Sequence, residues 1–444
     1  EFTAVLVKGR RNYLSLRRLE LAMARSKNPF DRDEDFVELR QINSWSKDTL
    51  DGSLSDLNQQ PAGHVWDEVA SDNTNCMGRR CPTYKKCFYY QDRRRVQNAQ
   101  ILVVNHALLF SDIALRRAGV SILPDYDVVI LDEAHTVESV AGDHLGIRIT
   151  NGQVEYILNK LYNDRTQKGL FIHHGLKQLQ QRVDQCRYLA DEFFGNLWEW
   201  REANSSSNGR VAEPNLVASP LSAELSALAK QVKAAGANIS EETEQQDFLS
   251  AHDRLAGLAG EIEAWRAQSL VGGVYWIETG KSRRGRPRLT LAAAPIDVGP
   301  ALREQLFDKL STVVMTSATL SIGRPSSNPS PASGRGKGRG FEFFQSRIGL
   351  TQCRTLQLGG PFNYKEQAAL VTLRDMPDPG DAQDYLHKCV DWIKHFVAET
   401  DGRTFVLFTS YDMLRRAASS LQPWLTSQNL RLLSQADGTP RTKM

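Results

Sequence analysis

Several features of membrane and secreted proteins are missing from this 444-residue sequence. No run of about 18 apolar residues occurs, which excludes an ordinary transmembrane helix. No charged-then-apolar leader opens the chain, so we expect no secretory signal, no membrane partner and a cytoplasmic location. Cysteine is also scarce, because the chain has six cysteines and three of them lie between residues 76 and 87. This bunching argues against a disulfide framework and favours metal binding in a reducing compartment.

Charge of one sign is not in large excess either. The sequence has 55 Lys and Arg against 52 Asp and Glu, a formal net charge of +3. Any nucleic-acid footprint must therefore come from local basic patches rather than from the whole surface. With 41% hydrophobic residues, the chain is long enough to bury several cores, and we expect two or three domains.

Four short apolar runs each lead into polar residues. They are "TAVLV" (3–7), "AQILVVNH" (99–106), "YDVVILDEAH" (126–135) and "STVVMTSATL" (311–320). Nearly continuous apolar runs of this length are typical of buried parallel strands, whose carboxyl ends carry the chemistry of α/β proteins. The sequence therefore predicts an α/β fold with a parallel sheet.

The middle of the chain has a different pattern. Apolar residues recur at helical spacing from about 150 to 272, which predicts a helical insertion. "GVYWIE" and "RLTLAAAPI" then flank a basic turn, as in a β-hairpin. Residues 323–340 are rich in Gly, Pro and Ser and are expected to form a linker or mobile loop. "GRTFVLFTSYDML" (402–414) predicts a further buried strand and a helix start, so we expect a second α/β domain from about 341.

The strongest chemical signal is Asp132-Glu133-Ala134-His135, at the end of the apolar run "DVVIL". A strand that delivers two adjacent carboxylates to the edge of a sheet can hold Mg²⁺ through Asp132, while Glu133 polarises an attacking water for phosphoryl transfer. His135 completes the candidate catalytic set. A four-residue acidic match is common by chance, and here the preceding strand pattern supplies the context that the motif requires.

A second group of polar residues follows the apolar run at 311–315. Thr316, Ser317 and Thr319, in "MTSATL", carry small hydroxyls suited to relaying the nucleotide state across a domain interface. Taken alone, the same residues would indicate only a Ser/Thr turn.

The order of these motifs resembles a known family. "KGRRNYL" near the start, a cysteine loop, "VVNHALL", DEAH, a helical insertion and TSAT follow one another along essentially the whole chain. This arrangement is similar to the XPD/DinG group of superfamily two iron-sulfur DNA helicases, with the DinG branch as the better match. The resemblance implies ATP-driven 5′ to 3′ translocation on single-stranded or forked DNA by a monomer, with roles in DNA repair.

The resemblance also implies a domain plan. It comprises a RecA-like parallel-sheet motor domain with a cysteine-rich cluster insertion and a helical arch insertion, followed by the start of a second RecA-like domain. The expected boundaries are 1–149 with the cluster insertion at about 15–98, 150–272 for the arch, 273–322 for the return to the motor domain, 323–340 for the linker and 341–444 for the second motor domain.

The family binds a [4Fe-4S] cluster through four cysteines, and this sequence matches three of them: Cys76, Cys81 and Cys87. Ser15 stands where the first family cysteine would be, and a serine hydroxyl is harder to deprotonate than a thiol. His64 and Cys186 are rival fourth ligands, although Cys186 also fits a buried core cysteine. A weakly held cluster or none remains the alternative. Zinc is disfavoured because the short C-x2-C knuckle is absent.

Candidate DNA-contacting residues follow two strand ends and one basic helix. They are Arg10, Asn12, Tyr13, Asn105, His106, Arg93, Arg94 and Arg95. Cations interleaved with aromatic rings suit phosphate contact and base stacking on a single strand. A solvated basic helix face is the alternative for "FYYQDRRRVQ" (88–97). The basic turn from Lys281 to Arg288 is a weaker candidate.

The sequence contains no phosphate-binding loop. "YWIETGKS" ends in Gly280-Lys281-Ser282, but Tyr275 occupies the position that needs glycine. The resemblance implies that the chain begins past the place where that loop would lie and ends before the family's arginine-finger segment. We therefore expect this chain alone not to hydrolyse ATP. Two functions remain: an ATP- and Mg²⁺-dependent DNA helicase, and a non-enzymatic, metal-bearing single-strand-binding module of helicase ancestry.

Overall fold

The computed structural model describes residues 2–24, 33–116, 119–218, 220–281, 285–321, 340–359 and 362–435. These fall into two compact units, the first formed by residues 1–56 and 61–358 and the second by 57–60 and 359–444. No helix in the described ranges is both long enough and apolar enough to cross a membrane. The expected linker at 323–340 lies almost entirely outside the described residues.

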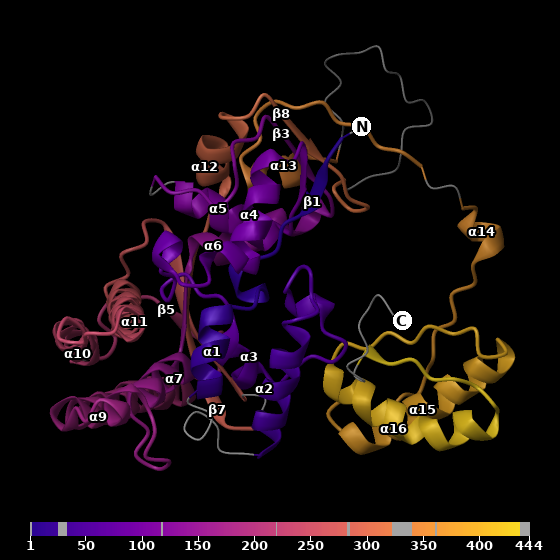
Figure 1. Cartoon of the computed structure of the whole chain (residues 1–444). Coiled ribbons are helices and arrows are strands. Elements are labelled where there is room, and N and C mark those ends of the chain that lie inside the picture. The colour runs from indigo at the N-terminus through magenta and orange to yellow at the C-terminus, as the bar shows by residue number, and fades with distance from the viewer. Residues whose placement is uncertain are drawn as a thin grey trace. The chain divides into compact units, whose positions relative to one another are not determined.

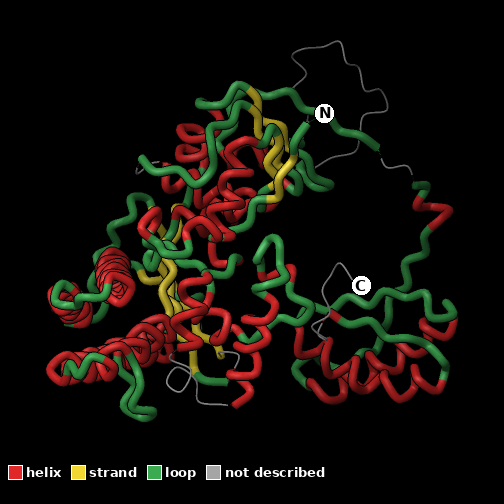
Figure 2. Tube along the Cα trace, in the orientation of Figure 1, coloured by secondary structure: helices red, strands yellow, loops and turns green. Residues whose placement is uncertain are grey.

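The first unit contains parallel strands with helices packed beside them (Figures 1 and 2). Its strands are β1 (Ala4–Leu6), β2 (Ile101–Val103), β3 (Val128–Leu131) and β8 (Thr312–Met315). Its helices here are α4 (Phe88–Asn98), α5 (His106–Arg116), α6 (Val137–Leu145), α12 (Gly299–Leu302), a π-helix (Arg303–Phe307) and α13 (Glu342–Ile348). β1 pairs with β2 and β3 pairs with β8, both in parallel, so strands distant in sequence meet as predicted.

The parallel strands are not buried on both faces, and this part of the prediction is wrong. Val5, Val129 and Val313 point into the core that the strands share with α5, α6 and α12. Leu6, Ile130 and the other alternate residues are exposed, because no described helix covers that face. The apolar runs in the sequence therefore reflect two apolar faces, of which the described residues cover one.

The segment between β1 and β2 contains the cysteine loop, residues 76–87. Its helices are α1 (Leu16–Ala24), α2 (Asp33–Trp45) and α3 (Gly63–Val69), with short 3-10 turns at Leu54–Asp56, Gly78–Arg80 and Tyr84–Lys86. Isolated β-bridges join Tyr13 to Ser53 and Leu14 to Ala70, so this segment folds back onto the residues that follow β1.

The predicted helical region forms its own core. It contains β4 (Ile147–Thr150), α7 (Asn151–Leu161), α8 (Leu170–His173), α9 (Lys177–Ala203), β5 (Arg210–Val211), α10 (Leu221–Gly236), α11 (Glu242–Arg266), β6 (Gly273–Lys281) and β7 (Pro287–Pro295). A capping box between Thr150 and Gln153 starts α7 directly after β4. The long helices lie together in Figure 1 and pack on the sheet.

The hairpin predicted around the basic turn is present as β6 and β7. The antiparallel sheet has the order β4-β7-β6-β5, and its residues share the core of α7, α9, α10 and α11. The structure therefore places 273–295 with the helical region rather than with the parallel strands. The basic turn itself includes residues 282–284, which lie outside the described ranges.

The second unit contains α14 (Tyr364–Gln367), α15 (Ala382–Glu399) and α16 (Tyr411–Ser427). Asp381 and Ser410 cap α15 and α16 through their side chains. The strand predicted within 402–408 is absent from the described structure, and Phe405 is fully exposed. A strand needs a hydrogen-bonded neighbour, and none pairs with this stretch among the described residues. The helix start predicted after it is confirmed by α16.

Candidate functional site

The DEAH and TSAT motifs meet at the carboxyl ends of β3 and β8. The Thr316 hydroxyl donates to Asp132 Oδ1 at 2.8 Å, and the Ala134 amide donates to the Thr316 carbonyl at 2.9 Å. The Thr316 amide in turn donates to the Leu131 carbonyl at 2.9 Å. Two motifs more than 180 residues apart therefore form one site, held by backbone and side-chain hydrogen bonds.

The carboxylate of Asp132 is exposed, and two hydrogen bonds favour its charged form. Its pKa is lowered by the hydrogen bond from Thr316 and by the amide of Glu133, which donates to Asp132 Oδ1 at 3.0 Å. Both contacts favour the charged form of the side chain. An ionised, exposed carboxylate at a strand end is a suitable ligand for Mg²⁺.

Glu133 has an unusual backbone conformation. Its φ of 50° and ψ of 42° place a non-glycine residue in the left-handed region, immediately after β3. Such conformations cost free energy and concentrate at functional sites. The Glu133 carboxylate lies 3.3 Å from His135 Nδ1, and the same nitrogen lies 2.9 Å from Ser317 Oγ. His135 therefore links the acidic motif to the hydroxyl motif.

The other residues of these motifs have mainly structural contacts. Asn105 Oδ1 accepts the Leu108 amide at 2.8 Å and so caps the start of α5. His106 Nδ1 lies 3.0 Å from the Thr136 hydroxyl, which ties α5 to the turn after Glu133. The Thr319 amide donates to Ser317 Oγ at 3.3 Å. Of these residues, His106 contacts the turn that follows the DEAH motif.

The cysteine loop places its thiols in an environment suited to thiolate chemistry. Burial raises the pKa of Cys76, but the Gly78 amide and the Arg10 guanidinium outweigh it, so the pKa is lowered. Burial raises the pKa of Cys87, and the nearby Cys76 and Cys81 add to this increase. Thiols that hinder one another's ionisation are stabilised by a bound cation. The donor set therefore fits a metal or an iron-sulfur group.

The rival fourth ligands lie elsewhere. His64 Nε2 pairs with Asp35 Oδ1 at 2.9 Å, and Cys186 is fully buried in the core of the helical region, where burial raises its pKa to about 12. Ser15 precedes α1, and its amide donates to the Val69 carbonyl at 2.8 Å. No hydrogen bond joins its hydroxyl to a cysteine within the part of the chain that the structure describes.

The predicted stacking role of Tyr13 is wrong for this structure. Its side chain is 1% exposed, and its hydroxyl donates to Asp92 Oδ2 at 2.7 Å. A ring enclosed in a core and bonded to a buried carboxylate offers no face to a base. Tyr13 was predicted from its position just past the strand at 3–7, and the sequence does not reveal its partner Asp92, which lies 79 residues away.

The basic residues of α4 differ in availability. Arg93 lies 5.3 Å above the Tyr89 ring, and its Nε donates to the Tyr89 hydroxyl at 3.0 Å. Arg95 is paired with the buried Asp92 at 2.9 Å. Arg94 is exposed and is therefore the most available phosphate ligand of the three.

Arg10 and Asn12 complete the DNA candidates near the strand β1. Arg10 stacks 3.9 Å from the Tyr89 ring centroid. Asn12 is exposed and donates to the Gly9 carbonyl at 3.0 Å. Asn12 therefore remains accessible, whereas the guanidinium of Arg10 is held between the cysteine loop and α4.

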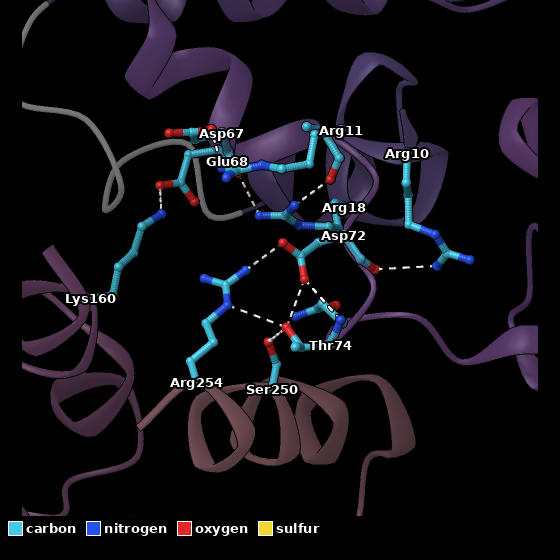
Figure 3. Close-up of polar contacts among 12 residues, drawn as sticks. Arg10, Arg11, Arg18, Asp67, Glu68, Asp72, Thr74, Lys160, Ser250 and Arg254 are labelled. Carbon is cyan, nitrogen blue, oxygen red and sulfur yellow. Dashed lines mark hydrogen bonds and ion pairs between the residues drawn. The ribbon is translucent and has the colours of Figure 1, made fainter. Parts of the chain in front are cut away.

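A polar junction that no sequence pattern predicted connects the cysteine-loop segment to the helical region (Figure 3). Its members are Arg18, Glu68, Asp72, Thr74, Lys160, Ser250 and Arg254. Asp72 accepts from Arg254 at 2.8 Å and from the Thr74 hydroxyl at 2.6 Å, while Lys160 contacts Glu68. Burial, together with Arg18 and Arg254, lowers the pKa of Lys160 to about 7.

Comparison with known proteins finds similarity to DNA helicases. Residues 68–154 match the DEAD_2 family model, a range that includes the cysteine loop and the DEAH motif. The chain is 29% identical over 429 residues to the ATP-dependent DNA helicase YoaA of Escherichia coli, covering 95% of this chain and 62% of that protein. It is 24% identical over 467 residues to the ATP-dependent helicase DinG of Mycobacterium tuberculosis, covering 98% and 62%.

A third relative is the 3'-5' exonuclease DinG of Bacillus subtilis, 24% identical over 473 residues, with 98% of this chain and 48% of that protein covered. The chain thus spans from about half to about three fifths of the length of these relatives. The matched ranges of the relatives cover almost the whole chain, including the DEAH and TSAT motifs. The chain is therefore similar, over almost its whole length, to DinG-like helicases of the XPD/DinG group.

Proposed function

We propose that the whole protein is an ATP-dependent DNA helicase or translocase that tracks 5′ to 3′ along single-stranded DNA and serves DNA repair. The observation that carries this proposal is the hydrogen bond between Asp132 and Thr316, which joins the DEAH and TSAT motifs at paired parallel strands. In this arrangement Asp132 would hold Mg²⁺ and Glu133 would orient the attacking water. Thr316, which is hydrogen-bonded to Asp132, would relay the nucleotide state to the neighbouring domain.

The proposal includes a domain plan and a cofactor. Residues around β1, β2, β3 and β8 would form a RecA-like motor domain, with the cysteine loop and the helical region as its insertions and a second motor domain after residue 340. Cys76, Cys81 and Cys87 would hold a [4Fe-4S] cluster, with Ser15 or an external ligand in the fourth position. When bound, the cluster would stabilise the packing of the cysteine loop on α4 and would take no part in phosphoryl transfer. We further propose a cytoplasmic monomer.

The alternative is a single-strand-binding module that has lost motor activity. It is favoured by Ser15 in place of a cluster ligand and by the lack of a GxxxxGK[ST] motif in the printed sequence. Both functions require single-stranded DNA, so DNA binding alone does not separate them.

Unwinding of a tailed duplex separates the two functions. The whole protein, with ATP and Mg²⁺, should release the strand of a duplex that carries a 5′ single-stranded tail and should leave a 3′-tailed duplex intact. A binding module would retain both duplexes whether or not ATP is present. Release of the 3′-tailed substrate alone would contradict the proposed polarity.

A further inference from the structure

Two adjacent histidines and a glutamate converge between helices α8 and α11, and none of them belongs to the DEAH motif or to the cysteine loop. His173 ends α8, His174 follows it, and Glu244 lies in the first turn of α11. One ligand atom from each of the three side chains lies within 4.8 Å of the other two. Residues about 70 positions apart in sequence therefore present two imidazoles and a carboxylate to one point.

The distances match those of a metal ligand set. His173 Nε2 lies 3.4 Å from Glu244 Oε1, and His174 Nε2 lies 3.9 Å from Glu244 Oε2. Bonds of about 2.0–2.2 Å to a tetrahedral ion place neighbouring ligand atoms about 3.4 Å apart. The first pair already has this spacing, and a small rotation of the carboxylate brings the second pair to it.

The surroundings hold the side chains in place. The rings of His173 and His174 meet edge to face with centroids 4.9 Å apart, and His174 packs 5.0 Å from the buried ring of Phe248. Glu241 caps α11 by accepting the amide of Glu244 at 2.6 Å, which fixes the backbone that carries the carboxylate. His173 also lines a cavity of about 390 Å³, so its side chain borders open space.

We propose that His173, His174 and Glu244 bind a single divalent transition-metal ion of the zinc class. Two imidazole nitrogens and one carboxylate oxygen are a known zinc ligand set, with a fourth position left for water. The ion would connect α8 to α11 and so fix the loop before α9 to the start of α11. The proposed site shares no residue with the DEAH motif or with the three cysteines, so its test does not depend on the proposed helicase activity.

The test is a titration of the metal-free whole chain with Zn²⁺ and, in parallel, with Co²⁺. Compared with the unsubstituted protein, His174→Gln and Glu244→Gln should each lose one equivalent of bound Zn²⁺. Co²⁺ at this site should give d–d absorption without the thiolate charge-transfer band expected of the cysteine loop. The matched control is His387→Gln, since this exposed histidine pairs with Asp391 at 3.5 Å in α15 and should leave the stoichiometry unchanged.

The outcome is decided by stoichiometry measured on folded proteins. Circular dichroism in chelator identifies a variant that fails to fold, and the more exposed His173→Gln then replaces it. Loss of one equivalent in two folded variants, with none lost in the control, supports the site. Equal Zn²⁺ binding by the unsubstituted protein and by these variants would show that the three residues form only an ion pair.

Discussion

At the residue scale, burial separates side chains that look equivalent in the sequence. Tyr13 and Arg94 both belong to aromatic and basic stretches, yet one lies in a core and the other in solvent. The reason is the partner of each side chain, because Asp92 accepts the Tyr13 hydroxyl and no described residue pairs with Arg94. Residue type and position predicted a nucleic-acid-binding surface, and only the fold distinguishes its exposed residues from the buried ones.

Replacing Tyr13 with phenylalanine tests this difference. Tyr13→Phe removes a buried donor and leaves one oxygen of Asp92 without it, which should cost about 1–3 kcal/mol of stability. Urea unfolding measures the loss, and Tyr188→Phe, at an exposed position, is the control with little expected change. Unchanged stability together with weaker DNA binding would show that Tyr13 contacts DNA after all.

Ser15 is the residue that decides how firmly a cluster is held. If the three cysteines bind an iron-sulfur cluster, Ser15→Cys should slow its loss in air, because a thiolate is a more readily formed ligand than an alkoxide. Visible absorbance and iron content of anaerobically purified protein measure the cluster over time. Protein with neither iron nor cluster absorbance would refute the cofactor assignment.

At the scale of elements, α4 and the polar junction differ in their structural roles. α4 combines a buried side toward Tyr13 with an exposed cation, whereas the junction joins the cysteine-loop segment to α7 and α11. The sequence pattern predicted the four parallel strands, the hairpin and the long helices, but it wrongly predicted a strand within 402–408. It did not predict the junction, because ion pairs between Asp72 and Arg254 leave no pattern across 182 positions.

Arg94 should contact phosphate if α4 lies on the DNA path. Arg94→Ala should weaken single-stranded DNA binding for all sequences alike and reduce the slope of log K against log salt by about 0.7. The exposed Lys230 of α10 supplies the control, since Lys230→Ala should leave both quantities unchanged. Equal losses in the two variants would indicate a general charge effect instead.

The polar junction should weaken in acid. Although burial alone would raise the pKa of Asp72, the Thr74 hydroxyl and the charges of Arg254 and Arg18 lower it below its ordinary value. A carboxylate with a lowered folded pKa stabilises fully above its unfolded pKa of about 4, and this stabilisation is lost as pH falls through the folded pKa.

Asp72→Asn should therefore cost about 1–3 kcal/mol at pH 7, and the difference from the unsubstituted protein should shrink as the pH falls below about 4. Thermal unfolding from pH 7 to pH 3 measures both effects. Asp253→Asn, on the exposed side of α11, should match the unsubstituted protein throughout. A constant difference across this range would show that the charge of Asp72 is not what stabilises the junction.

At the scale of the whole molecule, the motif order in the sequence predicted the similarity to DinG-like helicases that the comparisons support. The chemistry-bearing residues follow strand ends, and parallel strands bring their carboxyl ends to one edge, so the meeting of DEAH and TSAT could be predicted. The assignment of 273–295 could not, because strand pairing with β4 and β5 is a long-range contact. The sequence likewise could not predict that His173 and His174 meet Glu244, because this contact is also long-range. The two adjacent histidines can be seen in the sequence, but their partner cannot.

The central claim is that Asp132 and Glu133 form the magnesium and water site of a nucleic-acid motor. The direct measurement is DNA-stimulated ATP hydrolysis by the whole protein, by its Glu133→Gln variant and by this 444-residue chain. Glu133→Gln should lower turnover by about 10² to 10⁴-fold while DNA binding persists, and Asp125→Asn, at the other end of β3, should not. This chain should show no turnover, since its sequence contains no GxxxxGK[ST] motif to cradle the phosphates. Undiminished turnover by the Glu133→Gln whole protein, or appreciable turnover by this chain, would contradict the account.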